Sequence, residues 1–123
     1  MYKRQDTFGP IGEWDTSQVT IIRNLFHSKR DFNDDISQWD VSGVMDMAGM
    51  FLKASSFNRP VEGWSTGRVT AMDYMFFGAS SFNQPVEGWS TGCVTSMQSM
   101  FCDASSFNQP VEGWDTSQVT TSP

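Results

Sequence analysis

The sequence contains very few residues that can carry catalysis. Among its 123 residues there is one histidine, His27, and no motif places a serine or cysteine nucleophile beside it. Nucleophilic catalysis needs a nucleophile, a base and a group that orients the base, so we expect a protein that is not an enzyme. Phosphate-binding glycine loops, the H-E-x-x-H helix and paired-cysteine zinc spacings are also absent. The sequence therefore predicts no cofactor and no metal ion.

Cysteine is scarce as well. Cys93 and Cys102 are the only two, and both fall in a segment with helical spacing. Nine residues of helix would separate them by roughly 13 Å and turn them to opposite sides, beyond the reach of a disulfide. We expect two free thiols, which favours a reducing compartment.

Positive charge is limited and confined to one part of the chain. The sequence contains eight Lys and Arg residues and 14 Asp and Glu residues. The resulting net charge of −6 excludes the basic stripe of a nucleic-acid-binding protein. The first residues lack the apolar region of a signal peptide, and no stretch reaches membrane-spanning length, so we expect no membrane insertion. These absences predict a cytoplasmic chain as it stands, or a cell-surface one within a longer parent that carries signal and anchor.

The feature that dominates the sequence is tryptophan at a fixed interval of 25 residues. Other apolar positions keep the same interval, and so does an asparagine that follows phenylalanine. Such a period predicts a solenoid in which every unit buries its apolar face against its neighbours. The expected core is Trp14, Trp39, Trp64, Trp89, Trp114, Phe51, Phe76, Phe101, Met47, Met72 and Met97. The expected ladder of loop amides, bonded to loop backbone, is Asn33, Asn58, Asn83 and Asn108.

Two local periods occur inside each unit. Residues 36–41 have the L-x-x-L-x-L spacing of a leucine-rich repeat, which predicts a short parallel β-strand with Trp39 and Val41 pointing inward. Residues 44–51 place apolar side chains three, three and one positions apart, which predicts a short helix. A loop ending at proline follows. The expected fold class is thus an α/β repeat, with a strand, a helix and a loop in each 25-residue unit.

The segment SSFNQPVEGWSTGCVTSMQSMF, residues 80–101, resembles the BspA-like leucine-rich repeat surface-protein family. The family's short repeats contain W-D-x-S-x-V-x-x-M-x-x-M-F, and the resemblance extends over residues 8–120. It implies a right-handed leucine-rich-repeat-like solenoid with a role in cell-surface attachment or adhesion, and it brings no catalytic residues. The chain departs from the pattern at Ser65 and Ser90, where the family has Asp.

The repeat pattern predicts the domain organisation. We expect a capping segment at 1–9, a single solenoid domain of about four and a half repeats at 10–120, and a tail at 121–123. The pattern stops within a unit, after Trp114 and Val119. This predicts either self-association through an uncapped C-terminal end or continuation of the array in a longer parent.

Two regular polar columns suggest other functions. Glu62, Glu87 and Glu112 share one column and Asp15, Asp40 and Asp115 another, so a calcium site is an alternative. Serines interrupt the Asp column, however, and we favour solvated charges that discourage edge pairing. Columns of threonine suggest ice binding, but one column points inward and the other lies where a helix would begin, so capping is the better interpretation.

A binding surface must lie where the units differ. Leu52, Tyr74 and Phe77 occupy variable outward positions of the middle repeats, and Arg68 is a variable position on another face. We expect these four residues to contact a protein partner, whose identity the sequence does not give. The leading hypothesis is a non-catalytic protein-binding or adhesion module. The alternative is an architectural or assembly subunit that self-associates end to end or is a segment of a longer repeat array.

Overall fold

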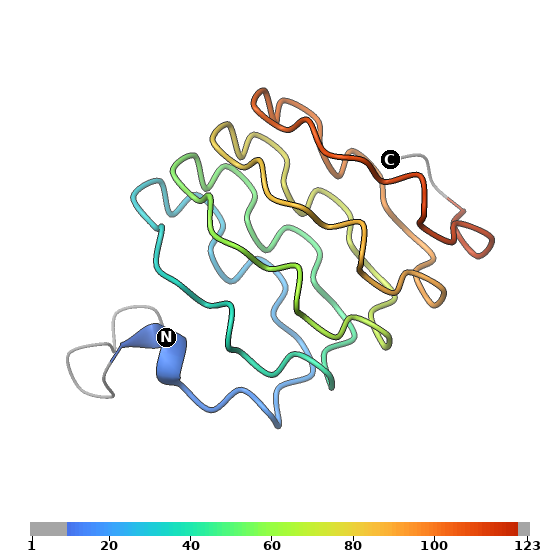
Figure 1. Cartoon of the computed structure of the whole chain (residues 1–123), viewed down its shortest axis with the longest axis horizontal. Coiled ribbons are helices and arrows are strands. Elements are labelled where there is room, and N and C mark those ends of the chain that lie inside the picture. Colours follow the sequence, from blue (N-terminus) through green and yellow to red (C-terminus); the bar gives the residue numbers. More distant parts are fainter. Residues whose placement is uncertain (1–9, 121–123) are drawn as a thin grey trace.

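The polypeptide winds into a stack of similar coils, each formed by one repeat. The computed structural model describes residues 10–120, so the predicted cap at 1–9 and tail at 121–123 lie outside the described residues. Figure 1 shows the coils side by side, from the blue N-terminal part to the red C-terminal part. We refer to residues 11–35, 36–60, 61–85 and 86–110 as the first to fourth coils, and to 111–120 as the partial fifth coil. The tandem repeat predicted from the tryptophan interval is confirmed, because hydrogen bonds join residues 25 positions apart.

Regular secondary structure is scarce within residues 10–120. The one named element is a short 3-10 helix, η2, at Ile11–Glu13. Beyond it, isolated parallel bridges join Ile21 to Asp46, Asp46 to Ala71 and Ala71 to Ser96. The coils therefore meet in register at one position, but no bridge extends into a strand of the described chain.

The strand expected at 36–41 does not form, and this correction has a clear cause. Trp39 N–H donates to the Ile36 carbonyl at 3.1 Å, and Val44 N–H donates to the Val41 carbonyl at 2.9 Å. These bonds close two consecutive β-turns, so the same N–H groups are not available to a neighbouring strand. The alternation of inward and outward side chains persists: Trp39 and Val41 are buried, while the intervening Asp40 is exposed.

The helix expected at 44–51 is also wrong. In a helix each N–H bonds four residues back, but Met47, Gly49 and Phe51 donate to carbonyls of the next coil at 2.8–3.0 Å. Gly49 has φ of +66° and Lys53 has φ of +59°, values that no right-handed helix contains. Successive β-turns, such as Met50 N–H to the Met47 carbonyl, produce the three-residue apolar spacing instead.

A continuous aromatic stack fills the interior. Phe51 lies 4.1 Å from Phe57 within its coil and 5.4 Å from Phe76 in the next coil, measured between ring centroids. Trp64 and Trp89 stack at 6.3 Å with ring planes 4° apart. Of the predicted core, nine side chains are buried, and two, Trp14 and Phe101, are partly buried against it. The buried nine are Trp39, Trp64, Trp89, Trp114, Phe51, Phe76, Met47, Met72 and Met97.

Side chains replace the backbone bonds that the missing strand would have made. The indole Nε1 of Trp64 donates to the Ile36 carbonyl of the preceding coil at 3.1 Å, and Trp89 donates to the Val61 carbonyl at 2.9 Å. Each tryptophan thus buries a large apolar surface while its polar atom is satisfied. The 25-residue tryptophan interval follows from this double requirement, because each ring must reach the same carbonyl of the coil before it.

Candidate functional site

Leu52, Tyr74 and Phe77 lie on the outside of the second and third coils. Tyr74 is 38% exposed, and Leu52 and Phe77 are half-buried. The Tyr74 and Phe77 rings contact each other at 5.9 Å with a tilt of 57°. Leu52 and Phe77 occupy equivalent positions of adjacent coils, and Lys53 N–H donates to the Phe77 carbonyl at 2.7 Å. The structure therefore places these three side chains in one region, which we call the outer apolar patch.

Tyr74 is held outward by its backbone. Its φ of +56° is a left-handed conformation, and its N–H donates to the Gln98 carbonyl at 2.8 Å. The equivalent positions in other coils, Asn24, Gly49 and Ser99, share the positive φ. A bulky aromatic residue is costly in this conformation, so its side chain is the exception in a column of small or polar residues.

Arg68 belongs to a different part of the coil. It is exposed and lies in the turn closed by Val69 N–H and the Thr66 carbonyl at 3.1 Å. The described part of the chain offers Arg68 no hydrogen bond or ion pair with the outer apolar patch. Among the four candidates, the ring contact of the described chain joins Tyr74 and Phe77 only.

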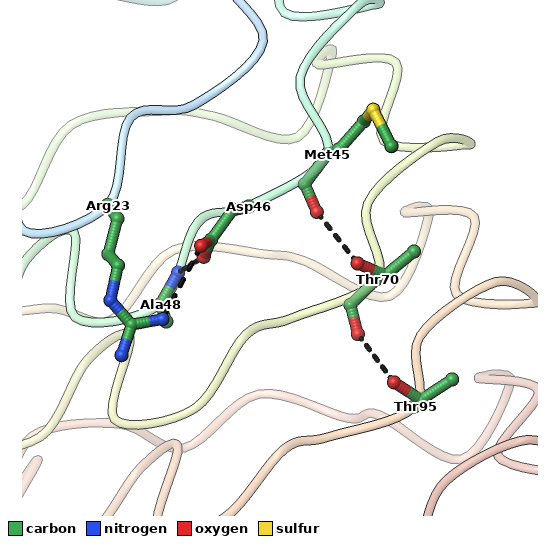
Figure 2. Close-up of polar contacts among 6 residues, drawn as sticks. All are labelled: Arg23, Met45, Asp46, Ala48, Thr70 and Thr95. Atoms are coloured by element: carbon green, nitrogen blue, oxygen red, sulfur yellow. Dashed lines mark hydrogen bonds and ion pairs between the residues drawn. The ribbon is translucent and has the colours of Figure 1, made fainter.

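Two strongly exposed apolar residues were missed by sequence reasoning. Ile21 is 65% exposed and Met45 is 50% exposed, both along the line of parallel bridges. Figure 2 shows Met45 at the start of a hydroxyl ladder, where Thr70 Oγ1 donates to the Met45 carbonyl at 3.1 Å and Thr95 Oγ1 donates to the Thr70 carbonyl at 3.2 Å. The available signal was Met45 itself, which interrupts a column of threonines.

An ion pair lies beside that ladder. Arg23 Nη1 is 3.4 Å from Asp46 Oδ2, and Asp46 Oδ1 accepts a hydrogen bond from Ala48 N–H at 3.0 Å (Figure 2). The Arg23 side chain is 56% exposed, so this pair fixes local geometry and contributes little stability.

The threonine column of the tryptophan segment faces inward except at Thr116, which is exposed in the partial fifth coil. Thr16, Thr66 and Thr91 are buried, and Thr66 Oγ1 donates to the Ser90 carbonyl of the next coil at 3.0 Å. A buried, bonded hydroxyl cannot contact ice. In the exposed second column, the hydroxyls of Thr70 and Thr95 are already bonded to main chain.

The asparagine column bonds coil to coil. Asn58 N–H donates to Asn33 Oδ1 at 2.8 Å, and the same bond recurs from Asn83 to Asn58 and from Asn108 to Asn83, each at 2.9 Å. The side-chain oxygen of each asparagine thus satisfies a loop N–H of the coil that follows. These amides hold the loops together.

Aspartates of the tryptophan segment are used in local turns. Asp40 Oδ1 accepts bonds from Ser42 Oγ at 2.6 Å and Ser42 N–H at 3.0 Å. Both bonds hold the pKa of Asp40 below its ordinary value, and the bond from the Ser42 hydroxyl has the larger effect. Ser17 lowers the pKa of Asp15 in the same way. These carboxylates are stabilised as anions by serine donors. Within the described residues no group of three His, Cys, Asp or Glu side chains is arranged to hold a metal ion.

A hollow of about 460 Å³ lies beside η2 at the N-terminal end of the described chain. Its lining combines carboxylates with one guanidinium and was not singled out in the sequence. The lining residues are Pro10, Ile11, Gly12, Glu13, Asp34, Asp35, Gln38 and Arg59. His27, Cys93 and Cys102 are exposed and lie elsewhere, and both cysteines are free thiols.

Residues 1–92 and residues 60–122 each match the family described as Mycoplasma protein of unknown function, DUF285. These matches cover nearly the whole sequence, so the chain belongs to this family. No curated protein and no solved structure gave a match. Across residues 10–120 there is no helix with the length and apolar character needed to cross a bilayer.

Proposed function

We propose that this DUF285 repeat chain is a non-catalytic protein-binding or adhesion module that uses the outer apolar patch. Its repeat pattern resembles the BspA-like leucine-rich repeat surface proteins, and we extend to it their right-handed solenoid and their role in attachment. The strand and helix of a leucine-rich repeat are not part of this proposal, because the coils are built from β-turns.

The observation that carries the proposal is the placement of Tyr74. The repeated apolar columns are buried in the inner coils, whereas Tyr74 interrupts a column of small or polar residues and is exposed beside Phe77. Tyrosine is enriched at the centre of protein interfaces because it buries a large area with little loss of side-chain entropy. A standard interface covers about 800 Å² on each partner, so a partner must also contact neighbouring coils.

Binding to an immobilised panel of purified extracellular-matrix proteins tests this function. The variant carrying Leu52→Ser, Tyr74→Ser and Phe77→Ser should lose the saturable binding seen for the unchanged chain. A matched control carries Ile21→Ser and Met45→Ser, which remove exposed apolar residues from the bridge line, and it should bind normally. Equal binding by the patch variant, at an unchanged melting temperature, would sink the proposal.

A second candidate function is architectural, as a subunit that self-associates through its C-terminal end. Phe101, Phe107 and Val111 near that end are only partly buried, although their equivalents in the third coil are fully buried. Sedimentation over a wide concentration range tests it: the average mass should rise with concentration, and a constant monomer mass would exclude it.

A further inference from the structure

The surface that carries the outer apolar patch consists of four columns of side chains. Backbone bonds join Asn24 N–H to the Ala48 carbonyl at 2.9 Å and Ser28 N–H to the Leu52 carbonyl at 2.7 Å, and equivalent bonds recur at the next two junctions. Residues 25 positions apart therefore lie in line along the stack. We call this surface the outer face, and define it as positions 23, 24, 27 and 28 of the first coil with their equivalents in the second, third and fourth coils.

Charge changes sign along the outer face. Its charged residues are Arg23 and Lys53 in the first two coils, and Asp73 and Asp103 in the next two. Arg23 is already paired with Asp46 at 3.4 Å. Lys53 and Asp103 are exposed and make no ion pair within residues 10–120. Over these four coils the outer face is therefore cationic on one side of the outer apolar patch and anionic on the other.

Such a surface is complementary to itself when two copies meet with their stacks antiparallel. A two-fold axis between the second and third coils, parallel to the chain direction on the outer face, sets the first coil opposite the fourth and the second opposite the third. Lys53 then lies one coil, about 4.8 Å, from the point opposite Asp103 of the other copy, which its flexible side chain can span. Arg23 has the same relation to Asp73 of the other copy.

Other arrangements of the two faces bring like charges together. With parallel stacks, the cationic coils of one copy would lie on the cationic coils of the other. A shift of one coil from the central register would set Lys53 opposite Lys53, or Asp73 opposite Asp73, of the other copy. Because like charges facing each other disfavour a complex, the charge pattern selects the antiparallel arrangement in its central register.

The apolar side chains fit the same arrangement. Tyr74, which is 38% exposed, lies opposite Gly49 of the second copy, a position without a side chain. The Asn24 amide oxygen borders that glycine and would meet the tyrosine ring. Phe77 lies opposite Leu52, and both are half-buried in the single chain. Large side chains thus face small or apolar ones, as packed interfaces require.

We propose that two copies of this chain pair through their outer faces with antiparallel stacks. Four coils spaced about 4.8 Å apart, each exposing about eight residues, provide on the order of 500 Å² per copy. This area is below the roughly 800 Å² per partner of a standard interface, so the dimer is weak and exchanges with monomers. Pairing regulates the site of the proposed function, on which this meaning rests, because a second copy covers the outer apolar patch that a partner would bind.

Two charge reversals, Lys53→Asp and Asp103→Lys, test the proposal by sedimentation at low salt. The average mass of the unchanged chain should rise with concentration toward that of a dimer and no further. Each variant alone should associate about tenfold more weakly, because its cross-copy pairs become like-charged. An equimolar mixture of the two variants should regain association, since both pairs are then attractive again. Only a contact between copies gives this rescue.

The matched control is Glu62→Lys, which reverses an exposed charge outside the outer face and should associate like the unchanged chain. Melting temperatures measured on all variants report whether they are folded. A constant monomer mass up to about 1 mM, a mixture that associates no better than its components, or an equal loss in the control would each overturn the proposal.

The pairing and the proposed function fail separately. If the mixed variants pair while the chain binds no matrix protein, pairing stands and the binding function falls. If the chain binds a matrix protein through the outer apolar patch while its mass stays that of a monomer, the function stands and pairing falls. End-to-end assembly would continue beyond a dimer and would survive Lys53→Asp, so sedimentation separates it from pairing through the outer face.

Discussion

The third and fourth coils carry the same phenylalanine pair but bury it to different extents. Phe76 and Phe82 are completely buried, whereas Phe101 and Phe107 remain partly exposed. The separation within each pair is the same, 4.1 Å between ring centroids. Local sequence therefore sets the geometry of the pair, and the coil that follows sets its burial. In such a stack, stability is the sum of each repeat and its contacts with nearest neighbours.

Alanine substitution of the rings should show the largest difference between these coils. Phe76→Ala removes a ring stacked on both sides and should cost about 3–5 kcal/mol of unfolding free energy. Phe101→Ala removes a ring that stays partly in water and should cost about 1–2 kcal/mol. Urea denaturation followed by tryptophan fluorescence measures both values. Equal losses would show that the third and fourth coils are not energetically distinct.

A smaller effect should come from the position where both coils adopt a left-handed backbone. Gly78 has φ of +70°, and an added Cβ would lie 3.2 Å from Lys53 Cγ. Gly78→Ala should therefore destabilise the chain by about 1–2 kcal/mol. Asp103, its counterpart in the fourth coil, has φ of +59° with an L side chain, so Asp103→Gly should stabilise by about 0.5–1 kcal/mol. Melting temperatures that move in the same direction for both variants would contradict the assigned backbone conformation.

The smallest expected effect is on the pH dependence of stability, which should differ between the second and third coils. Asp40 accepts the Ser42 hydroxyl and has a lowered pKa, whereas the third coil has Ser65 and Gly67 at these positions. Because the folded-state pKa is lowered, the stabilising contribution is complete above the unfolded pKa of about 3.9 and is lost as the pH falls through the folded pKa. Ser42→Gly should raise the Asp40 pKa toward its ordinary value and weaken this acid sensitivity. An NMR titration of the Asp40 carboxyl carbon measures the shift, and an unchanged pKa would remove the hydroxyl as its cause.

Periodicity predicted the repeat and the inward-facing residues, but it could not predict the backbone. Met47 and Met50 are three residues apart, and this spacing suits both a helix and consecutive β-turns. The choice depends on where Gly49 N–H finds its acceptor, which is Asp73 in the next coil. An acceptor 24 residues away leaves no local mark in the sequence.

The candidate binding residues also differ in how far the sequence predicted their placement. Tyr74 and Phe77 stood out because they vary within otherwise repeated columns, and the structure shows their rings in contact. Arg68 varied in the same way and is exposed in a separate turn, closed by Val69 N–H and the Thr66 carbonyl.

The sequence by itself determined the 25-residue repeat and the stacking of its aromatic columns, because apolar rings at a constant interval must be buried against one another. Tertiary structure alone decided that turns replace strand and helix, since the hydrogen bonds of Gly49 and Phe51 are satisfied only by the next coil. It also decided how deeply each repeated ring is buried, since Phe76 is completely buried between neighbouring coils whereas Phe101 remains partly exposed.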